Sequence, residues 1–589
     1  MPFISLIPPI YTNVKQYGAL GDGTTDDTTA IAATFAALPA AGGVVFFPPG
    51  DYKITSTIAF TFGANQHVVI EGAGNARLVS TIAEPGGEDG ILRFTGDAGI
   101  TARLTIRNLI ISHTNSGLGL LDGIFVQPLN YGSGGTQSVA NLELDNVRIT
   151  GASKFGARIL GAIGGIVSNC RMNTNRDSGL ALTGCLDMTV IGGDYSSNVS
   201  GSLAGDYGIT LASSSFLPAC KNILISGVQA NSNGRKGIDV HHGHNVHIIG
   251  NTCIGNGYVG IYAVMEDTTK DVGDITIMGN TIDQTGGNNT LVNNGVQIGT
   301  FGTTGTLTPG SFIVSGNKIF GVDAGTTASN AIAITTATTG VPPDRIIISN
   351  NTIKNGAGSA GYVIEHTGTL VIPYLEITGN VLHAVSCTAG VWIQQATDII
   401  VNANDLRIDS GTPNYGFLLV ASANSTVVGN QINGVALTSL PISTSSTTLA
   451  RANTRNGVAL VDTAFLAPFT IASTLTIDAF GHVLALASGA PTLSAVNANV
   501  ANQVLAGNDV RGSITFDVIT GTLAAGSTLF TVTFTNAYGS APFVVTTNAS
   551  NQTTTTFYLT SVVAGSFIVR NSAALVVATG YKFNYIVIG

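Results

Sequence analysis

Charged residues are scarce in this sequence of 589 residues, of which Asp, Glu, Lys and Arg make up only 10%. A typical soluble protein has about 25%. The formal net charge is −9, which argues against a polyanion such as nucleic acid as the partner. No uninterrupted apolar stretch approaches the roughly 20 residues that a membrane helix needs. We therefore expect neither nucleic-acid binding nor membrane insertion.

Cysteine is also rare, and its spacing fits neither a disulfide framework nor a metal site. No CxxC pair occurs, and we expect buried free thiols, no cofactor and no metal. The opening MPFISLIPPI has no basic segment and is broken by prolines, so we do not expect a signal peptide. The cysteine usage fits synthesis in a reducing cytoplasm. The five cysteines are Cys170, Cys185, Cys220, Cys253 and Cys387.

Glycine and short repeats are abundant instead. One phrase recurs, a short apolar strand, then Gly or Ser, then Asn, then a second apolar strand, as in IIGNTCI and IMGNTID. From Asn251 to Asn430 the Asn intervals are 29, 37, 34, 29, 24 and 26 residues. Uneven periods in this range favour a solenoid over a propeller. We expect each Asn to take the left-handed corner conformation and to bond to the next Asn in a ladder. The repeated positions are Asn169, Asn251, Asn280, Asn317, Asn351, Asn380, Asn404 and Asn430.

A long motif precedes these repeats, VKQYGALGDGTTDDTTAIAATFAALPAAGGVVFFPPGDYKITSTI, residues 14–58. It resembles the opening of the pectate-lyase-like superfamily, which is common among phage tailspikes and polygalacturonase-like enzymes. The resemblance implies an all-β chain, with a right-handed single-stranded parallel β-helix over residues 14–437. Residues 1–13 would then be a short segment available for virion attachment.

Within the motif we predict a helix over Thr28–Leu38, because Ile31, Phe35 and Leu38 recur at helical spacing. Asp26 or Asp27 can cap its start, and Gly42-Gly43 would end it. Such a helix would cover the open end of the β-helix, whose unpaired strand edges otherwise promote aggregation. We favour turn and cap roles for Asp22, Asp26 and Asp27 over calcium binding.

The repeat stops after Asn430. Residues 438–456 are rich in Ser and Thr and predict a linker or stem. From residue 457 to 589 the strands are longer and alternate, which predicts an antiparallel sandwich-like domain. This part is similar to the C-terminal modules of phage tail proteins, a resemblance that implies trimerisation or receptor contact.

A second alignment predicts a functional surface. The phrase Gly-apolar-x occurs in many coils, and its third residue should face solvent on one sheet, about 4.8 Å from its neighbour on the next coil. Sugar rings stack on aromatic side chains, while hydroxyls bond to carboxylates and amides, so this wall predicts a polysaccharide partner. Its predicted substrate-binding members are Arg158, Tyr262, Gln297 and Trp392, and the row also contains Asp239. For Trp392 a surface or inter-subunit contact is favoured over a sugar platform.

The densest group of polar residues lies in GRKGIDVHHGHN and GYVGIYAVMED. Glycoside hydrolysis needs two carboxyl groups on either side of one bond, and Asp239 with Glu266 is the pair we favour. The two would be ~13 Å apart on a straight strand, unless a turn after Val264 brings them together. A lyase is the alternative, with His241 or Lys236 as base and Arg235 as stabiliser. The predicted site comprises Asp239, Glu266, Asp206, Asp267 and His241 as catalytic candidates, with Arg235 and Lys236 as further substrate contacts.

Two weaker signals remain in the sequence. His241, His242 and His244 suggest a metal, but adjacent strand residues point to opposite faces, and turn or hydrogen-bonding roles are favoured over zinc. Glu365-His366 is a second candidate site without an identified partner.

Together these observations favour a homotrimeric phage tailspike that binds and hydrolyses a bacterial surface polysaccharide and attaches to the virion tail directly or through an adaptor protein. A non-catalytic receptor-binding tail protein and a polysaccharide lyase remain alternatives. A secreted cellular polygalacturonase-like enzyme is disfavoured, because we predict no signal peptide and an additional C-terminal domain.

Overall fold

The structure is a computed structural model. Its N-terminal part describes residues 11–460 except 98–100, 115–118, 201–204, 266–271, 286–292, 301–309, 323–328, 337–340, 356–360, 386, 388, 411–412, 423, 438–441 and 444–447. Its C-terminal part describes residues 475–477, 483–485, 492–495, 500–507, 511–518, 522–534, 543–548, 557–563, 566–572, 574–575 and 578–588. The chain forms two compact units, Met1–Ala467 and Pro468–Gly589.

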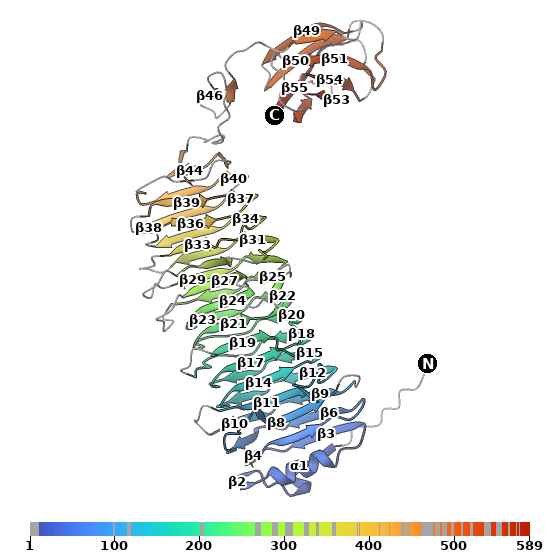
Figure 1. Ribbon diagram of the computed structural model, residues 1–589, viewed down its shortest axis with the longest axis vertical. Coiled ribbons are helices and arrows are strands. Elements are labelled where there is room, and N and C mark those ends of the chain that lie inside the picture. The colour runs from blue at the N-terminus through green and yellow to red at the C-terminus, as the bar shows by residue number, and fades with distance from the viewer. Residues whose placement is uncertain are drawn as a thin grey trace. The chain divides into compact units, whose positions relative to one another are not determined.

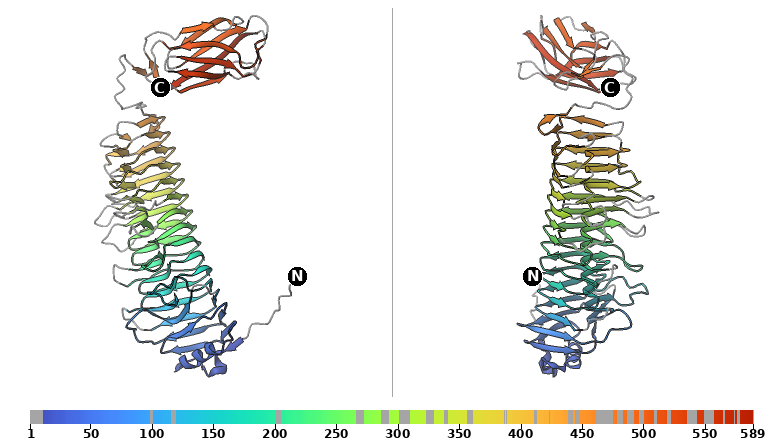
Figure 2. Two further views of the ribbon diagram at one scale, coloured as in Figure 1. Left: turned by 45° about the vertical axis from the view of Figure 1, so that its right-hand side comes forward. Right: turned by 90° about the vertical axis from the view of Figure 1, so that its left-hand side faces the viewer.

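The first unit is a parallel β-helix (Figures 1 and 2). Each coil contributes one strand to each of three sheets, as in β22 (Gly243–Ile249), β23 (Thr252–Ile254) and β24 (Val259–Met265). Each strand pairs in parallel with its equivalents on neighbouring coils. In the part of the chain that the structure describes, sheet A has sixteen strands, from β1 (Tyr11–Asn13) to β43 (Thr448–Arg451). Sheet B is there divided into two parts, of six and nine strands, and single bridges at Asp194 and Gln229 link the two parts.

Sheet C positions the candidate site. It has fourteen strands, and each follows a sheet B segment along the chain. Its strands are β5 (Ile58–Thr61), β8 (Asp89–Gly96), β11 (Leu121–Pro128), β14 (Phe155–Leu160), β17 (Ser178–Thr183), β19 (Tyr207–Ala212), β21 (Lys236–Val240), β24, β27 (Asn294–Thr300), β30 (Ile332–Thr336), β33 (Tyr362–Thr367), β36 (Ala389–Gln394), β39 (Tyr415–Val420) and β42 (Ile442–Ser443).

The predicted Asn ladder exists, and it is continuous from Asn251 to Asn453. Each Asn donates its Nδ2 to the Oδ1 of the next Asn at 2.9–3.0 Å. Each side chain is buried and so replaces solvent as a hydrogen-bond partner at the corner between sheets A and B.

Two details of the prediction are wrong. The left-handed corner residue is the one before the ladder Asn, for example Gly250 with φ +66° and Ala403 with φ +52°. Asn169 occupies this corner position, with φ +53°, and is exposed, while the buried ladder position of its coil holds Cys170. The corner requires a residue with positive φ, whereas the ladder requires a buried amide. Two adjacent residues therefore occupy the two positions.

A second ladder lies before the sheet C strands, and the sequence alignment missed it. Asn175, Asn198, Asn233 and Asn256 are buried and joined by amide–amide hydrogen bonds of 3.0–3.2 Å. Gln284 extends the ladder by accepting from the backbone N–H of Asn256. These amides fix the corner from which the polar strands of sheet C begin.

The predicted capping helix is present as α1 (Thr28–Ala36), at the N-terminal end of the β-helix (Figure 1). Asp26 Oδ1 accepts from the backbone N–H of Thr28, whereas Asp27 accepts from those of Leu20 and Gly21. The helix ends well before Gly42-Gly43, which instead begin β3 (Gly42–Phe47). Asp22 bonds to Thr24 and Thr25, and among the described residues no His, Cys, Asp and Glu cluster could hold a metal.

The β-helix extends beyond its predicted boundaries at both ends. Residues 11–13, expected in an attachment segment, form β1 and pair with β3. The predicted linker 438–456 contains β42, β43 and β44 (Thr454–Arg455), which pair with strands of the preceding coil. Its Asn453 continues the ladder.

The second unit contains two four-stranded antiparallel sheets. One comprises β48 (Thr492–Ala495), β51 (Thr528–Thr533), β54 (Ser566–Asn571) and β53 (Phe557–Val563). The other comprises β49 (Val500–Gly507), β50 (Arg511–Val518), β55 (Ala578–Ile588) and β52 (Phe543–Asn548). Ile514, Phe530 and Phe567 share one buried core. The antiparallel pairing was predicted, and a sandwich remains the prediction for this unit. No helix of the described chain has the length and hydropathy of a membrane span.

Candidate functional site

The strand register confirms that the predicted residues form one row, which we call the sheet C row. Its residues alternate with core residues such as Ile238 and Val240, so they lie on the outer side of the sheet. In chain order the row is Arg93, Phe125, Arg158, Ala181, Thr210, Asp239, Tyr262, Gln297, Ala333, Glu365, Trp392 and Leu418.

The prediction that this row faces solvent is wrong for most of its members. Asp239 is 0% exposed and Tyr262 is 3% exposed, and Arg158 and Gln297 are also buried. Neighbouring side chains cover them: Tyr262 packs with Val259, Val264 and Tyr258 in a small cluster outside the main core. Trp392 and Glu365 remain partly exposed.

A second outward row runs beside the first, and the sequence alignment overlooked it. Its members precede the Gly of the Gly-apolar-x phrase. The strand ladders skip that Gly, so the residues on both sides of it lie in register with their counterparts. The row includes Phe155, Ser178, Tyr207, Lys236, Val259 and Asn294.

The two rows meet in what we call the Asp239 cluster. Lys236 Nζ lies 2.9 Å from Asp239 Oδ1, and both side chains are 1% exposed. Thr210 Oγ1 donates to Asp239 Oδ2 at 3.1 Å. The Lys236 ammonium also lies 3.4 Å from the centroid of the Tyr262 ring, a cation–π contact made stronger by burial. Asp239 is therefore a buried ion-pair partner.

Two more accessible groups border this ion pair. His241 Nδ1 lies 3.7 Å from Asp239 Oδ2, within ion-pair range, and the His241 side chain is 33% exposed. Arg235 Nη1 donates to the Tyr207 hydroxyl at 3.0 Å, and its guanidinium lies 5.7 and 5.6 Å from the rings of Tyr207 and Tyr258. The cluster thus combines an imidazole, a guanidinium and phenols around one buried carboxylate.

The remaining predicted catalytic carboxylates have different positions. Asp206, on the preceding coil, is buried and accepts from the Ser200 backbone N–H. Burial raises the pKa of Asp206, against the hydrogen bonds from Ser200 and the charge of Arg235. Glu266 and Asp267 lie outside the described residues, so their pairing with Asp239 stays a prediction. The neighbouring imidazoles have separate partners: His242 bonds to Ser213, and His244 pairs with Asp274.

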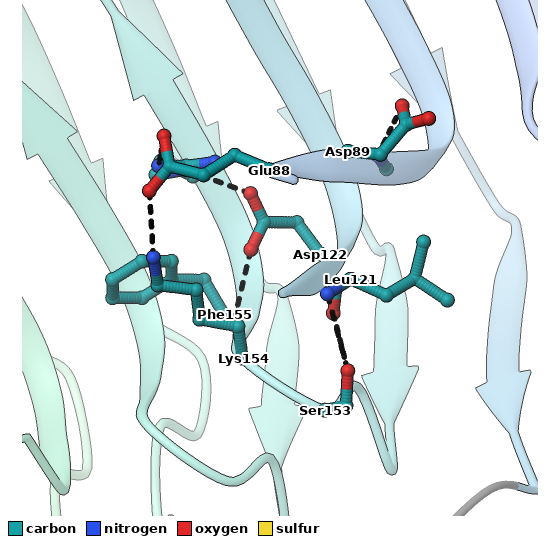
Figure 3. A network of polar contacts seen from close by, with 9 residues as sticks. Glu88, Asp89, Leu121, Asp122, Ser153, Lys154 and Phe155 are labelled. Atoms are coloured by element: carbon teal, nitrogen blue, oxygen red, sulfur yellow. Dashed lines mark hydrogen bonds and ion pairs between the residues drawn. The ribbon is translucent and has the colours of Figure 1, made fainter. Parts of the chain in front are cut away.

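A second charged group, the Arg158 cluster, lies three coils nearer the N-terminus. Arg158 binds Asp122 through Nε and Glu88 through Nη1, both at 2.7 Å. Lys154 also binds Glu88, and Phe155 donates its backbone N–H to Asp122, as Figure 3 shows. The Arg158 guanidinium lies 4.1 Å from the Phe125 ring centroid.

The pKa values of the two carboxylates of this cluster are shifted in opposite directions. Burial raises the pKa of Asp122 to about 7, against the charge of Arg158. For Glu88, burial acts in the same direction, but the hydrogen bond from Lys154 and the charge of Arg158 outweigh it. The pKa of Glu88 therefore lies below its usual value. The sequence could have identified Asp122, because Asp-Gly-Ile-Phe at residues 122–125 repeats the Gly-apolar-x phrase one coil earlier.

The other predicted contacts lie farther along the row. Gln297 is two coils from Asp239, and Trp392 is five coils from it, or about 24 Å at the ordinary strand spacing. The structure therefore brings together Asp239, His241, Lys236, Arg235 and Tyr262, with Asp206 adjacent, and places Arg158, Gln297 and Trp392 elsewhere on the same face.

Comparisons with known proteins agree with the resemblance of residues 14–58. Residues 11–261 match the family described as rhamnogalacturonase A/epimerase, pectate lyase-like. Mannuronan C5-epimerase AlgE2 of Azotobacter vinelandii is 29% identical over 270 residues, covering 43% of this chain and 25% of that protein. Alginate lyase 7 of the same organism is 34% identical over 154 residues, covering 24% and 17%. The chain thus spans a quarter or less of these relatives' lengths.

Two solved structures share this likeness at low identity. The A-module of A. vinelandii mannuronan C-5 epimerase AlgE6 gives a TM-score of 0.37 at 17% identity, covering 75% of this chain and 98% of that one. The Pseudomonas phage phi297 tailspike gp61 gives 0.35 at 13% identity, covering 98% and 99%. The pectate-lyase-like resemblance of the N-terminal motif is confirmed by the family match.

Proposed function

We propose that this chain is a phage tailspike that binds a bacterial surface polysaccharide along sheet C and acts on it at the Asp239 cluster. The observation that carries the proposal is the set of partly exposed groups along sheet C: His241 and Arg235 at the Asp239 cluster, and Glu365 and Trp392 farther along the sheet C row. These groups lie on coils stacked about 4.8 Å apart. Imidazole, guanidinium, carboxyl and aromatic groups in such an arrangement suit an extended polymer of sugar rings and hydroxyls. The aligned relatives named mannuronan epimerase and alginate lyase give further support.

Proton abstraction next to a uronate carboxylate fits this cluster better than hydrolysis by Asp239. Asp239 is fully buried and already accepts from Lys236 and Thr210, so it is poorly placed to attack or protonate a glycosidic bond. Asp239 and Lys236 are instead positioning residues. Arg235 would stabilise the charge that develops on the substrate carboxylate, and His241 would take the proton α to it.

The products depend on the step after proton abstraction. In elimination, the electron pair of the broken C–H bond forms a carbon–carbon double bond, and the neighbouring sugar oxygen leaves and acquires a proton. In epimerisation, a proton returns to the opposite face of the same carbon. Tyr207, whose hydroxyl accepts from Arg235, is the proposed proton donor in either case.

Hydrolysis is the second candidate, and Asp206 favours it. Burial raises the pKa of Asp206, which is the direction that favours the protonated form that a general acid needs. Its carboxyl partner would be Glu266 or Asp267. A non-catalytic receptor-binding spike is the remaining possibility for the same row.

The full-length protein can be tested against sodium alginate, polygalacturonate and purified host capsule or lipopolysaccharide. Ultraviolet absorbance detects an unsaturated uronate, reducing ends detect any cleavage, and proton NMR detects epimerisation. We expect unsaturated or epimerised product, and we expect His241→Ala to slow its formation by at least about 100-fold. His247→Ala, which changes a partly exposed imidazole on sheet A, is the matched control and should leave the rate unchanged.

Each other result selects an alternative. Reducing ends without unsaturated product would indicate hydrolysis, and Asp206→Asn should then remove the activity. Saturable binding of capsule without any product would indicate a receptor-binding spike. Absence of both binding and product with every polymer would contradict the proposed function.

Self-association into a trimer is part of the same proposal, and sheet A supports it. Its outer face exposes Ile166, Ile191 and Met278 at 38%, 45% and 42%. Large apolar side chains exposed along one face commonly mark a protein interface. We propose that this face and the C-terminal unit contact other copies of the chain, and that the spike is carried on the virion tail directly or through an adaptor.

A further inference from the structure

The C-terminal half of the sheet C row carries a second group of residues suited to a sugar. Glu365 and Trp392 are consecutive members of the row. Tyr362 lies three residues before Glu365, in register with Ala389. Tyr362, Glu365 and Trp392 are all partly exposed, unlike the buried Asp239 and Lys236.

The two aromatic rings form a platform. The ring centroids of Tyr362 and Trp392 are 4.6 Å apart, with an interplanar angle of 51°. Among the residues that the structure describes, Trp392 Nε1 has no hydrogen-bond partner and is shielded from solvent. The side chain is nevertheless partly exposed, so a sugar would meet other atoms of the indole, as in stacking on an aromatic ring.

Glu365 supplies a carboxyl group beside this platform. Its Oε2 accepts from Asn330 Nδ2, and Asn330 is itself bound to the Asn294 side chain through its backbone N–H. Asn294 donates to Gln297, which donates to Thr335. This chain of amides holds the carboxyl group in place from the two preceding coils.

The protonation of this carboxyl group determines the kind of sugar that fits. Burial raises the pKa of Glu365 to about 7, more than the Asn330 hydrogen bond lowers it. Near neutral pH the group can donate as well as accept a hydrogen bond, as sugar hydroxyls and acetamido groups require. An anionic uronate would add a second negative charge in a site that already disfavours one.

We propose that Tyr362, Glu365 and Trp392 form a second saccharide subsite, which binds an uncharged sugar residue of the polysaccharide. The subsite is four coils from Asp239, or about 19 Å at the ordinary strand spacing, and so contacts a different residue of the same polymer. This inference rests on the proposed function for its polymer, but the subsite binds its sugar without the chemistry at His241.

The lone tryptophan makes the inference directly testable. Trp392 is the only Trp in the chain, so its fluorescence reports on this site alone. The full-length protein would be titrated with glucose, galactose, mannose, rhamnose, N-acetylglucosamine and N-acetylgalactosamine, and with glucuronate and oligomannuronate as the charged comparison. We expect a saturable fluorescence change with at least one uncharged sugar, and binding at least tenfold weaker for both charged probes at pH 8.

Variants that retain Trp392 test the individual groups. Tyr362→Ala and Glu365→Ala should each weaken sugar binding at least tenfold, whereas Tyr374→Ala, a control directly before β34 (Leu375–Thr378) of sheet A, should not. His241→Ala should bind the sugar as the unmodified chain does, which separates this inference from the proposed function. The inference is overturned if no uncharged sugar changes the fluorescence, if only uronates do, or if Tyr362→Ala and Glu365→Ala bind normally while remaining folded by circular dichroism.

Discussion

Arg158 is a buried residue of sheet C whose guanidinium pairs with neighbouring carboxylates. Its side chain is 7% exposed, it binds two carboxylates, and its Nη2 is buried without a hydrogen-bond partner among the residues that the structure describes. A buried ion pair contributes little net stability, but removal of one member leaves the other charged or protonated without a partner. The structural role of Arg158 is therefore to keep Asp122 compatible with burial.

Replacement of Arg158 should accordingly destabilise the β-helix. We expect Arg158→Met, which keeps the volume, to lower the free energy of unfolding by about 3–5 kcal/mol, measured as a lower thermal midpoint and denaturant midpoint. Arg77→Met removes an exposed partner of Asp51 and should cost less than about 1 kcal/mol. Equal effects of the two substitutions would contradict the role given to Arg158.

The raised pKa of Glu365 leads us to expect that the stability of the protein depends on pH. Burial raises that pKa to about 7 in the folded protein, whereas an unfolded Glu titrates near its ordinary value of about 4.3. Between these values the folded state binds more protons than the unfolded state, so the contribution of Glu365 to stability falls as pH rises from about 4 to 7 and is constant above that. The loss is on the order of 3 kcal/mol.

Glu365→Gln, which cannot titrate, should remove this part of the dependence. Thermal unfolding at pH 5 and pH 8 would be compared for both proteins, and the variant should lose less stability between the two. Asp405→Asn, at an exposed carboxylate on sheet B, provides the control. An unchanged pH profile in Glu365→Gln would show that the folded pKa of Glu365 is near its ordinary value.

At the scale of a coil, the Asn ladder makes a testable contribution. The Asn317 side chain makes four hydrogen bonds within it: its Nδ2 donates to Ile277 and Asn351, and its Oδ1 accepts the backbone N–H and side chain of Asn280. Because Asn317→Ala leaves buried groups unpaired, we expect it to lower the free energy of unfolding by about 2–4 kcal/mol. Asn402→Ala, on the half-buried outer face of sheet A, should cost little, and chemical denaturation of both variants would measure the difference.

The sequence alone predicted the repeating strands and corners, but it did not predict which side chains cover them. Local spacing predicted the coils, the ladder from Asn251 and the alignment of Asp239 with Tyr262, because one residue on each coil meets the same environment. It failed on exposure, since Asp239 is enclosed by Lys236 of its own strand together with Thr210 and Tyr262 of the neighbouring coils. The sequence alignment also did not place Lys236 and Tyr207 in one row. The Gly that follows each of them interrupts the inward–outward alternation of side chains that the alignment assumed.

For the whole molecule, the outer face of sheet A predicts self-association. Charge on this face would oppose burial against another copy, so Ile191→Glu combined with Met278→Glu should shift the protein toward monomers in mass photometry and analytical ultracentrifugation. Val381→Glu, at a 50% exposed position on sheet B, should leave the assembly unchanged. Retention of the same oligomer by the double variant would place any interface elsewhere, and a monomeric unmodified chain would contradict trimerisation.

The strand-per-coil construction also determines how such a protein can change its specificity. Each coil between Tyr262 and Glu365 adds one rung of about 4.8 Å to the distance between the Asp239 cluster and the aromatic pair. Duplication or deletion of one coil would therefore alter this distance by a fixed step while preserving the chemistry at both ends. A lineage could in this way adjust to glycans with longer or shorter repeat units by gain or loss of complete coils, without redesign of either cluster.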